Sequence, residues 1–430
     1  MSLNENLINR RNKVVSRGIG LISNFTTLSG KGALLRDLEG NEYIDFTSGI
    51  GVTALGHCPE EIVSAIKNQA DKLLHACIMV STYEPYIELC ETLVELFPHG
   101  NNTKVMLTNT GAESVENAIK IARQYTKKQA IICYSGAFHG RSYMAMSLTS
   151  KVSYKENCSP FNSEIYRLQF PSYYHYNDGL SYSDFIKREI NRLNNFFNEY
   201  VSPNNVAAII IELIQGEGGF NVAPIEYVQE LRNICDKYNI LLIFDEVQSG
   251  FCRTGKWAAY QHYNVIPDIS TWAKALGSGL PIGAVIGKQE IMDSAITGTL
   301  GGTYIGNPLS CVSAIETIKY MKKNNINQKA LEIGEKIKSN FEPLKKKYSG
   351  IGDIRGLGAM MAIEFVKNNS EPDSEFVSTL LKSCWKRNLL VINSGLHKNV
   401  LRFLIPLTIE NELLEKGLNI IKEEIINLYS

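Results

Sequence analysis

The stretch ILLIFDEVQSGFCRTGKWAAYQHYNVIPDISTWAKALGSGLPIG, from Ile240 to Gly283, decides the fold of this chain. It opens with the apolar run Ile240–Phe244, which is long enough for a buried strand and ends on Asp245. A second apolar segment, 269–273, ends on Lys274 and is followed by a glycine-rich run. The carboxyl ends of parallel strands are where open α/β sheets bind ligands, so we expect an α/β sheet with a site at these two residues.

An acid and a lysine in this arrangement suit the chemistry of pyridoxal phosphate. A lysine amine can bond to the aldehyde of that cofactor, and a carboxylate can keep its ring nitrogen protonated. Taken alone, Asp245 is more simply a strand-end cap and Lys274 a solvated surface lysine. Together, with SGFCRTGK between them, they resemble the signature of the class III aminotransferases, and this resemblance implies pyridoxal 5′-phosphate as the cofactor.

The composition is that of a globular protein. The chain has 430 residues, 44% of them hydrophobic and 20% charged, with 44 basic and 44 acidic side chains. This balance argues against nucleic acid or an anionic membrane as a partner, and the apolar runs are too short for a membrane span. The nine cysteines have no CxxC spacing, so we expect reduced thiols, no metal site and a cytoplasmic protein; the polar N-terminus shows no signal peptide.

The order of apolar patterns predicts strands that alternate with helices, without internal repeats. Residues 1–30 read as polar and irregular, and 34–46 as a β-hairpin around a Glu-Gly-Asn turn. Further strands are expected at 104–108, 130–134, 206–211 and 283–287, and near 352–365 and 399–406. Helices are expected at 116–125, 184–200, 224–238 and 374–387, after about residue 327, and at the C-terminus.

Three other positions are candidates for binding. Gly111 and Ala112 lie where a strand gives way to a helix, and the free N–H groups there can bind a phosphate; an ordinary tight turn is an equal alternative. Arg402 is the sole charge in the apolar run VLRFLIPL and requires an anionic partner. That partner is either an internal carboxylate or the α-carboxylate of a substrate, and the two can bind Arg402 at different times.

The chain resembles the class III aminotransferases from RGIG at 17–20 to IPLT at 405–408, with SGFCRTGK and GAFHGR as the most specific segments. The resemblance implies the type I pyridoxal-phosphate fold. This fold has a large domain (61–320) with a mostly parallel seven-stranded sheet and a small α+β domain formed by both termini (1–60 and 321–430). It also implies a homodimer, or a dimer of dimers, whose active sites are shared between subunits.

The resemblance implies a role for each residue that matches the family's cofactor site. Lys274 is expected to bond to the cofactor and then to move a proton, and Asp245 to hold the ring nitrogen protonated. Phe138 and Val247 enclose the ring, Gln248 contacts its phenolic oxygen, and the phosphate is held by Gly111, Ala112 and the partner subunit's Thr303. Many relatives carry tyrosine in place of Phe138, and a serine often stands in place of Ala112.

The substrate residues follow from the same resemblance. Ile50 is expected at the mouth of the pocket, although from sequence alone it is more simply a core residue. Arg141 is expected to bind the distal carboxylate of the substrate. Glu217 is expected to pair with Arg402 while an ω-amino acid is bound, and to move away when 2-oxoglutarate needs that arginine.

These residues predict a transaminase that moves the amino group of an ω-amino acid, with 4-aminobutyrate as the expected donor, to 2-oxoglutarate. The products are succinate semialdehyde and glutamate. Another class III enzyme remains an alternative: an ornithine, 5-aminovalerate or lysine aminotransferase, or an amino acid epimerase. A protein without catalytic activity is disfavoured, because both Lys274 and Asp245 are present.

Overall fold

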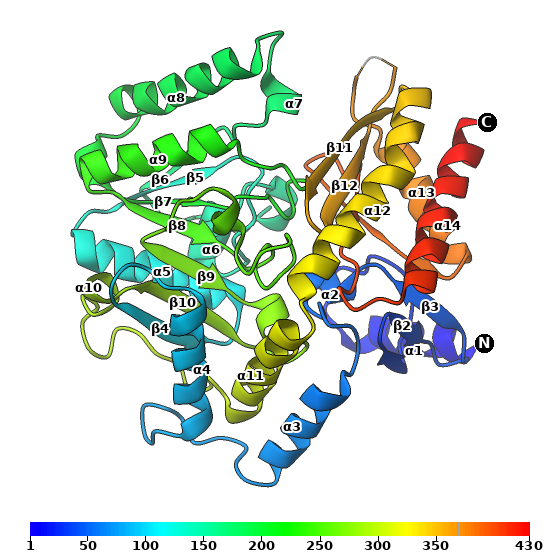
Figure 1. The fold of residues 1–430 in the computed structure, drawn as a ribbon, viewed down its shortest axis with the longest axis horizontal. Helices are drawn as coiled ribbons and strands as arrows, with labels where there is room; N and C mark the ends of the chain where they lie inside the picture. Colours follow the sequence, from blue (N-terminus) through cyan, green and yellow to red (C-terminus); the bar gives the residue numbers. More distant parts are fainter. Residues whose placement is uncertain (369) are drawn as a thin grey trace.

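The computed structural model describes residues 1–368 and 370–430, and a seven-stranded sheet forms its centre (Figure 1). The strand order is β4-β10-β9-β8-β7-β5-β6. Neighbours from β9 to β6 pair in parallel, whereas β10 runs antiparallel to both β4 and β9. The predicted α/β class with a mostly parallel seven-stranded sheet is therefore confirmed. The strands are β4 (Thr103–Thr108), β5 (Ala130–Tyr134), β6 (Ile165–Leu168), β7 (Val206–Ile211), β8 (Leu241–Asp245), β9 (Ile269–Trp272) and β10 (Gly283–Lys288).

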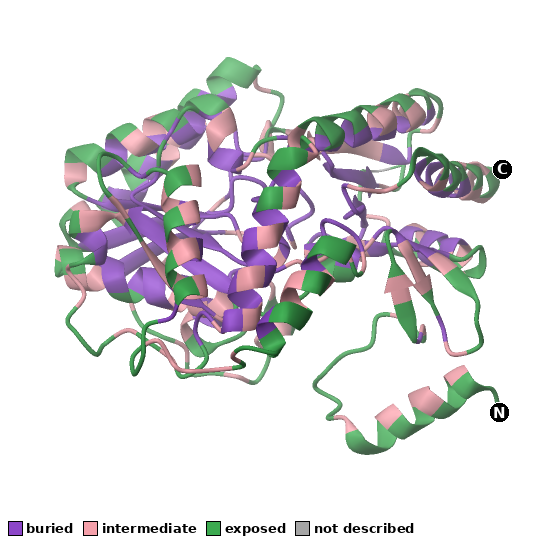
Figure 2. Cartoon of the chain, turned by 60° about the horizontal axis from the view of Figure 1, so that its bottom comes forward, coloured by how far each residue is buried: buried purple, intermediate pink, exposed green. Residues whose placement is uncertain are grey.

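Helices cover both faces of this sheet (Figures 1 and 2). In β5, Ile132 packs into the core on the side of α8 and α9, whereas its neighbours Ile131 and Cys133 pack into the core on the side of α5 and α6. Strands covered on both faces need apolar residues at every position, which is why β5, β7 and β8 appear in the sequence as unbroken apolar runs. The helices of this part are α3 (Glu60–Ala70), α4 (Glu84–Leu96), α5 (Gly111–Thr126), α6 (Tyr143–Leu148), α7 (Tyr173–Tyr176), α8 (Tyr182–Glu199), α9 (Ile225–Tyr238), α10 (Gln289–Met292) and α11 (Pro308–Lys323).

Two four-stranded sheets lie beside this part, built from the two ends of the chain. One has the order β1-β2-β3-β13 and contains the predicted hairpin of β2 and β3; the C-terminal strand β13 joins it in parallel to β3. The other has the order β11-β12-β15-β14. The elements are β1 (Ser29–Lys31), β2 (Leu34–Arg36), β3 (Glu42–Asp45), α2 (Ser48–Gly51), α12 (Ile326–Lys347), β11 (Ile351–Leu357), β12 (Met360–Phe365), α13 (Ser374–Lys386), β13 (Leu389–Leu390), β14 (Ile392–Ser394), β15 (Val400–Phe403) and α14 (Asn411–Tyr429).

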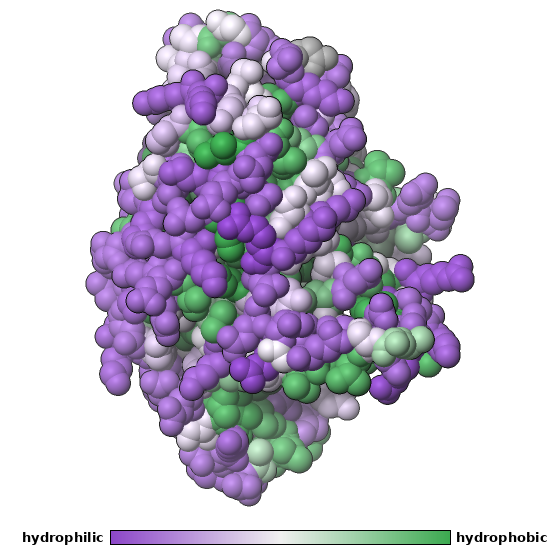
Figure 3. Space-filling view, turned by 90° about the vertical axis from the view of Figure 1, so that its right-hand side faces the viewer, coloured by the Kyte–Doolittle hydropathy of each residue, from purple (hydrophilic) through white to green (hydrophobic). Residues whose placement is uncertain are grey.

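The pairing of β3 with β13 supports a small domain made from both termini. We propose that it comprises residues 1–60 and 321–430, and that residues 61–320 form the large domain, since β4 to β10 all lie in that range. Figure 3 shows the face on the side of α13 and α14, where hydrophilic side chains predominate. In the described ranges, no helix has the length and apolar character needed to cross a membrane.

The prediction that residues 1–30 are irregular is wrong for Leu3–Val14, which form helix α1. The Ser2 side chain accepts a hydrogen bond from the Glu5 backbone N–H, and the Glu5 side chain accepts one from the Ser2 backbone N–H. This reciprocal pair is a capping box, which stabilises a helix start without help from a core. No residue of α1 is buried, so the apolar periodicity that would have revealed the helix is absent.

Gly283 allows three elements to meet where β10 begins. A Cβ atom at this position would lie 2.5 Å from Thr108 Oγ1, 2.6 Å from Ser114 Oγ and 2.7 Å from the carbonyl oxygen of Trp272. Thr108 and Ser114 hydrogen bond to each other, and Trp272 is a strand residue, so none of these atoms can move away freely.

Replacing Gly283 with alanine should therefore lower the free energy of unfolding by about 1–3 kcal/mol, the usual cost of overpacking a core. Urea titration followed by circular dichroism measures this change. Gly20→Ala is the matched control, because nothing lies within 4 Å of a Cβ atom there. Equal stability of the two variants would contradict this account of the β4, α5 and β9 junction.

Candidate active site

A cavity of about 560 Å³ opens at the ends of β8 and β9, a volume that suits a small-molecule site. Because these strands are parallel neighbours, Asp245 at the end of β8 and Lys274 just beyond β9 reach the same space. Nine of the candidate residues line this cavity: Gly111, Ala112, Phe138, Arg141, Glu217, Asp245, Val247, Gln248 and Lys274. Residues that are far apart in the sequence are thus brought together by the sheet.

Asp245 is held in a fixed orientation at the base of the cavity. Its Oδ2 lies 2.7 Å from Nδ1 of the buried His139, and its Oδ1 accepts a hydrogen bond from the Val247 backbone N–H at 3.0 Å. A carboxylate fixed in this way faces a ligand in the cavity with a constant orientation. Sequence reasoning did not assign a role to His139, although it lies in the GAFHGR segment.

Glu212, at the end of β7, is a second buried carboxylate that sequence reasoning did not assign to the site. Its Oε2 accepts a hydrogen bond from the Phe138 backbone N–H and its Oε1 accepts one from Gly216, both at 2.9 Å. Burial raises the pKa of Glu212 to about 7, and the neighbouring Asp245 also raises it while His139 opposes the shift. Glu212 therefore fixes Phe138 and the start of the 216–220 loop. Its position at a strand end was the available signal.

Lys274 is half-buried and has a left-handed backbone conformation, with φ of 47°. No hydrogen bond or ion pair joins its Nζ to the residues that the structure describes. Burial lowers the pKa of Lys274 from 10.5 to about 8, although the nearby Glu217 partly opposes this shift. A sizeable fraction of this amine is consequently neutral, and nucleophilic, near physiological pH.

The N-terminus of α5 forms another wall of the cavity. Thr110 caps this helix by accepting a hydrogen bond from the Glu113 backbone N–H at 3.2 Å. The first N–H groups of a helix have no partner within it, and the helix dipole attracts anions to them. A Cβ atom on Gly111 would lie 2.8 Å from Val247 Cγ1, so glycine is required for this close approach.

These residues fit pyridoxal phosphate. A fixed carboxylate, a reactive amine and a helix N-terminus suit the ring nitrogen, the aldehyde and the phosphate of that cofactor. In addition, the buried Oε1 of Gln248 has no hydrogen-bond partner within the described part of the chain, so this amide is available to a ligand. Phe138 and Val247 line the same cavity and can enclose a planar ring.

Arg402, on β15, is buried, and its Nη1 forms an ion pair with Oε1 of Glu217. The hydroxyl of Tyr154 donates a hydrogen bond to the other oxygen, Oε2, at 3.2 Å. Burial alone would raise the pKa of Glu217, but the Arg402 guanidinium outweighs this effect and lowers it. The guanidinium of Arg141 lies over the ring of Tyr154, 4.8 Å from its centroid. Two arginines therefore lie near the cavity, and one of them carries an internal counter-ion.

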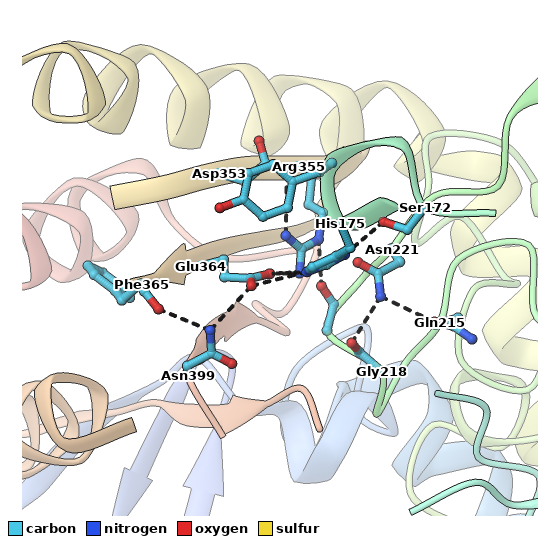
Figure 4. A network of polar contacts seen from close by, with 12 residues as sticks. Ser172, His175, Gln215, Gly218, Asn221, Asp353, Arg355, Glu364, Phe365 and Asn399 are labelled. Atoms are coloured by element: carbon cyan, nitrogen blue, oxygen red, sulfur yellow. Dashed lines mark hydrogen bonds and ion pairs between the residues drawn. The ribbon is translucent and has the colours of Figure 1, made fainter. Parts of the chain in front are cut away.

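A polar network (Figure 4) fastens the loop that carries Glu217 to β11, to β12 and to Gly395. Gly395 N–H donates to the Glu217 carbonyl at 3.0 Å, and Arg355 Nε donates to the Gly219 carbonyl at 2.9 Å. Arg355 also pairs with Glu364 at 2.6 Å, and Glu364 lies 3.0 Å from Nε2 of His175. Burial by itself would raise the pKa of Glu364. The contacts of Glu364 with His175 and Arg355 outweigh this effect and lower the pKa to about 2. Glu364 is therefore held as an anion, and the network anchors the backbone of the loop on either side of residue 218.

Three candidates do not line the cavity of their own chain: Ile50, Thr303 and Arg402, the last of which contacts the cavity wall through Glu217. Ile50 is 38% exposed and lies two residues before Val52, which does line it. Thr303 is exposed in the turn before α11. Neither position contradicts the predicted roles at a pocket mouth and toward a partner subunit, and both roles stay predictions.

Comparison with known proteins places this geometry in context. The family model for class III aminotransferases matches residues 20–425. The chain is 40% identical to the 4-aminobutyrate aminotransferase GabT of Escherichia coli, with 98% of each chain covered. It is 41% identical to the 5-aminovalerate aminotransferase DavT of Pseudomonas putida, also with 98% of each covered. Among solved structures, an (S)-enantioselective ω-transaminase from Thermomicrobium roseum matches with a TM-score of 0.92 and 27% identity over 99% of both chains.

The lowered pKa of Lys274 can be tested by chemical labelling. In protein freed of cofactor, the rate of reductive methylation of Lys274 by formaldehyde should rise with pH and reach half its maximum near pH 8, because the amine is protonated below its pKa. Peptide mass spectrometry measures this rate, with the exposed Lys382 as an internal reference for the reagent and Lys274→Ala to confirm the peptide assignment. A midpoint near the ordinary lysine value of 10.5 would contradict the effect of burial.

Proposed function

The chain belongs to the class III aminotransferases, and we propose that it transfers the amino group of 4-aminobutyrate to 2-oxoglutarate, giving succinate semialdehyde and glutamate. The observation that carries this proposal is the ion pair between Glu217 and Arg402 at a cavity that also contains Arg141 and Lys274. An arginine with its own removable counter-ion suits an enzyme whose two substrates differ by one carboxylate.

The cofactor of this family is pyridoxal 5′-phosphate, which supplies an aldehyde that reacts with amines and a ring that withdraws electrons from the neighbouring carbon. We propose that Asp245 holds the proton of the ring nitrogen and that Lys274 bonds to the aldehyde. When it is not bonded to the aldehyde, the Lys274 amine would accept the proton from the amino-bearing carbon of the substrate and donate it again later in the reaction. Phe138 and Val247 would enclose the ring and exclude water, with Gln248 at its phenolic oxygen. Gly111, Ala112 and the partner subunit's Thr303 would hold the phosphate.

The arginines explain how one site could accept both substrates. 4-Aminobutyrate has one carboxylate, which we assign to Arg141, and Glu217 then neutralises Arg402. 2-Oxoglutarate has two carboxylates, so its α-carboxylate takes the place of Glu217 on Arg402 and its distal carboxylate binds Arg141. A planar guanidinium can bind either carboxylate through two parallel hydrogen bonds. Ile50 is proposed to border the path into this site.

A second candidate donor is 5-aminovalerate, because the relatives from Pseudomonas that are named for it are as similar as those named for 4-aminobutyrate. This donor also lacks an α-carboxylate and is longer by one methylene group. The pair of Glu217 and Arg402 would serve it in the same way. An epimerase, in contrast, handles α-amino acids only and has no need for a removable counter-ion on Arg402.

We further propose that the protein forms a homodimer. Large apolar side chains are exposed around Thr303: Leu74, Met79, Val80 and Tyr304, of which Val80 is 85% exposed. The two segments lie together, since the His75 and Tyr304 rings are 5.1 Å apart and Asn307 donates to the Leu74 carbonyl. If a second copy of the chain covers these exposed apolar side chains, Thr303 of each subunit would lie near the active site of the other. The nine cysteines are free thiols, which agrees with the cytoplasmic location that we propose. A dimer of dimers is the alternative assembly.

The function is tested by a donor screen on the cofactor-loaded enzyme. With 2-oxoglutarate as acceptor, 4-aminobutyrate should give the highest kcat/KM among 4-aminobutyrate, 5-aminovalerate, ornithine and lysine, measured as glutamate formed. Lys274→Ala, which lacks the amine, should abolish turnover. Glutamate formation from α-amino acids only, or racemisation without any need for a keto acid, would refute the proposal.

The role of Glu217 is tested by Glu217→Ala. Removing it leaves the buried Arg402 unneutralised beside an ω-amino acid donor, and loss of a buried partner is costly. The kcat/KM for 4-aminobutyrate should fall relative to that for glutamate by about tenfold if the loss is about 1.4 kcal/mol. Stopped-flow half-reactions with each donor measure this ratio. Glu412→Ala, on the exposed start of α14, is the matched control, and an unchanged ratio in Glu217→Ala would contradict the role.

A further inference from the structure

Tyr154 lies between the two arginines that are expected to bind substrate carboxylates. Its ring supports the guanidinium of Arg141, whose Cζ is 4.8 Å from the ring centroid, and its hydroxyl donates to Glu217 Oε2 at 3.2 Å. Glu217 in turn is paired with Arg402. A single side chain, held in the short turn Val152–Tyr154, therefore contacts both carboxylate-binding systems.

The hydroxyl of Tyr154 completes the coordination of Glu217. One carboxylate oxygen of Glu217 accepts from Arg402 and the other accepts from Tyr154, so the side chain is held from both sides. Burial, followed by the nearby Glu217 charge, raises the pKa of Tyr154, so its hydroxyl remains a donor at neutral pH. A donor to a charged carboxylate makes one of the stronger hydrogen bonds in proteins, and its loss should be measurable.

The ring of Tyr154 packs against the guanidinium of Arg141. No carboxylate of the described residues pairs with Arg141, which is exposed toward the cavity. Its neighbours are the faces of Tyr154 and of Phe138, whose centroid lies 5.8 Å from the guanidinium carbon. Phe138 also packs edge-on against Tyr154, at 5.2 Å between centroids. Aromatic faces attract a cation without neutralising it, which leaves Arg141 free to bind a carboxylate.

We propose that Tyr154 is a specificity-determining residue of this enzyme: its hydroxyl stabilises the closed pair of Glu217 and Arg402 that ω-amino acids require, and its ring orients Arg141 for both substrates. This inference rests on the proposed function. When the α-carboxylate of glutamate or 2-oxoglutarate displaces Glu217 from Arg402, the hydrogen bond from Tyr154 must also break. The hydroxyl therefore favours donors that have no α-carboxylate.

Tyr154→Phe removes the hydroxyl and keeps the ring. The ratio of kcat/KM for 4-aminobutyrate to that for glutamate should fall about tenfold, since a hydrogen bond to a charged group is lost only in the closed state. Tyr154→Leu removes the ring as well and should, in addition, raise KM for both donors. In the Glu217→Ala background, Tyr154→Phe should leave the ratio unchanged, because the hydroxyl has lost its partner.

Binding of unreactive analogues provides a readout that needs no turnover. Calorimetry on the cofactor-loaded enzyme should show that Tyr154→Phe weakens butyrate, which has one carboxylate, relative to glutarate, which has two. Tyr182→Phe is the matched control, since Tyr182 lies at the exposed start of α8, outside the cavity lining, and its hydroxyl donates to Glu226 at 3.1 Å. A wild-type enzyme inactive with 4-aminobutyrate would refute the proposed function, while the butyrate-to-glutarate ratio would still test Tyr154. Equal weakening of both analogues, or the same effect in the Glu217→Ala background, would overturn the inference.

Discussion

The parallel pairing of β8 with β9 is the constraint on which the site depends. In this register Asp245 lies opposite Thr271, so the strand that ends on the acid and the strand that leads to the lysine finish at the same edge. Both strands are buried on each face, and a shift of register would expose apolar side chains along their whole length. The position of Lys274 relative to Asp245 is therefore secured by the packing of the sheet, and not by contacts between the two residues.

The site also requires charged side chains to be buried, and Asp245, Arg402 and Lys274 differ in the partners that offset the cost of burial. Asp245 is satisfied by His139 and by a backbone N–H, whereas Arg402 is satisfied by Glu217. Lys274 has no such partner among residues 1–368 and 370–430, so burial acts on it without full compensation and its pKa falls to about 8. The same physical cost is thus offset by hydrogen bonds and an ion pair at Asp245 and Arg402, and it leaves a reactive amine at Lys274.

The pair of Glu217 and Arg402 spans two parts of the chain. Glu217 lies on a loop after β7, and Arg402 lies on β15 of a different sheet. Arg355 (Figure 4) donates to the Gly219 carbonyl, and the Gly395 N–H donates to the Glu217 carbonyl, so both fasten the backbone of that loop without touching the carboxylate of Glu217. The backbone of the loop is therefore anchored while the Glu217 side chain keeps the freedom to change partners, as an enzyme with two different substrates requires.

The sequence by itself determined the strands and helices whose apolar pattern is continuous. β5 and β7 lie where the unbroken apolar runs predicted them, because a strand covered on both faces leaves a local signal. The fold type and the roles of the candidate residues around Lys274 came instead from the resemblance of long motifs to the class III aminotransferases. Helix α1 was missed because a capping box, and not a buried face, stabilises it.

Only the tertiary structure decided which charges meet. His139, Tyr154 and Glu212 belong to the site because of contacts with residues 106, 63 and 74 positions away, and no pattern within a segment encodes such separations. The same is true of Arg355, whose Nε reaches a carbonyl 136 positions away. Periodicity reports which face of an element is buried, whereas the partner of a buried charge depends on how separate elements pack in three dimensions.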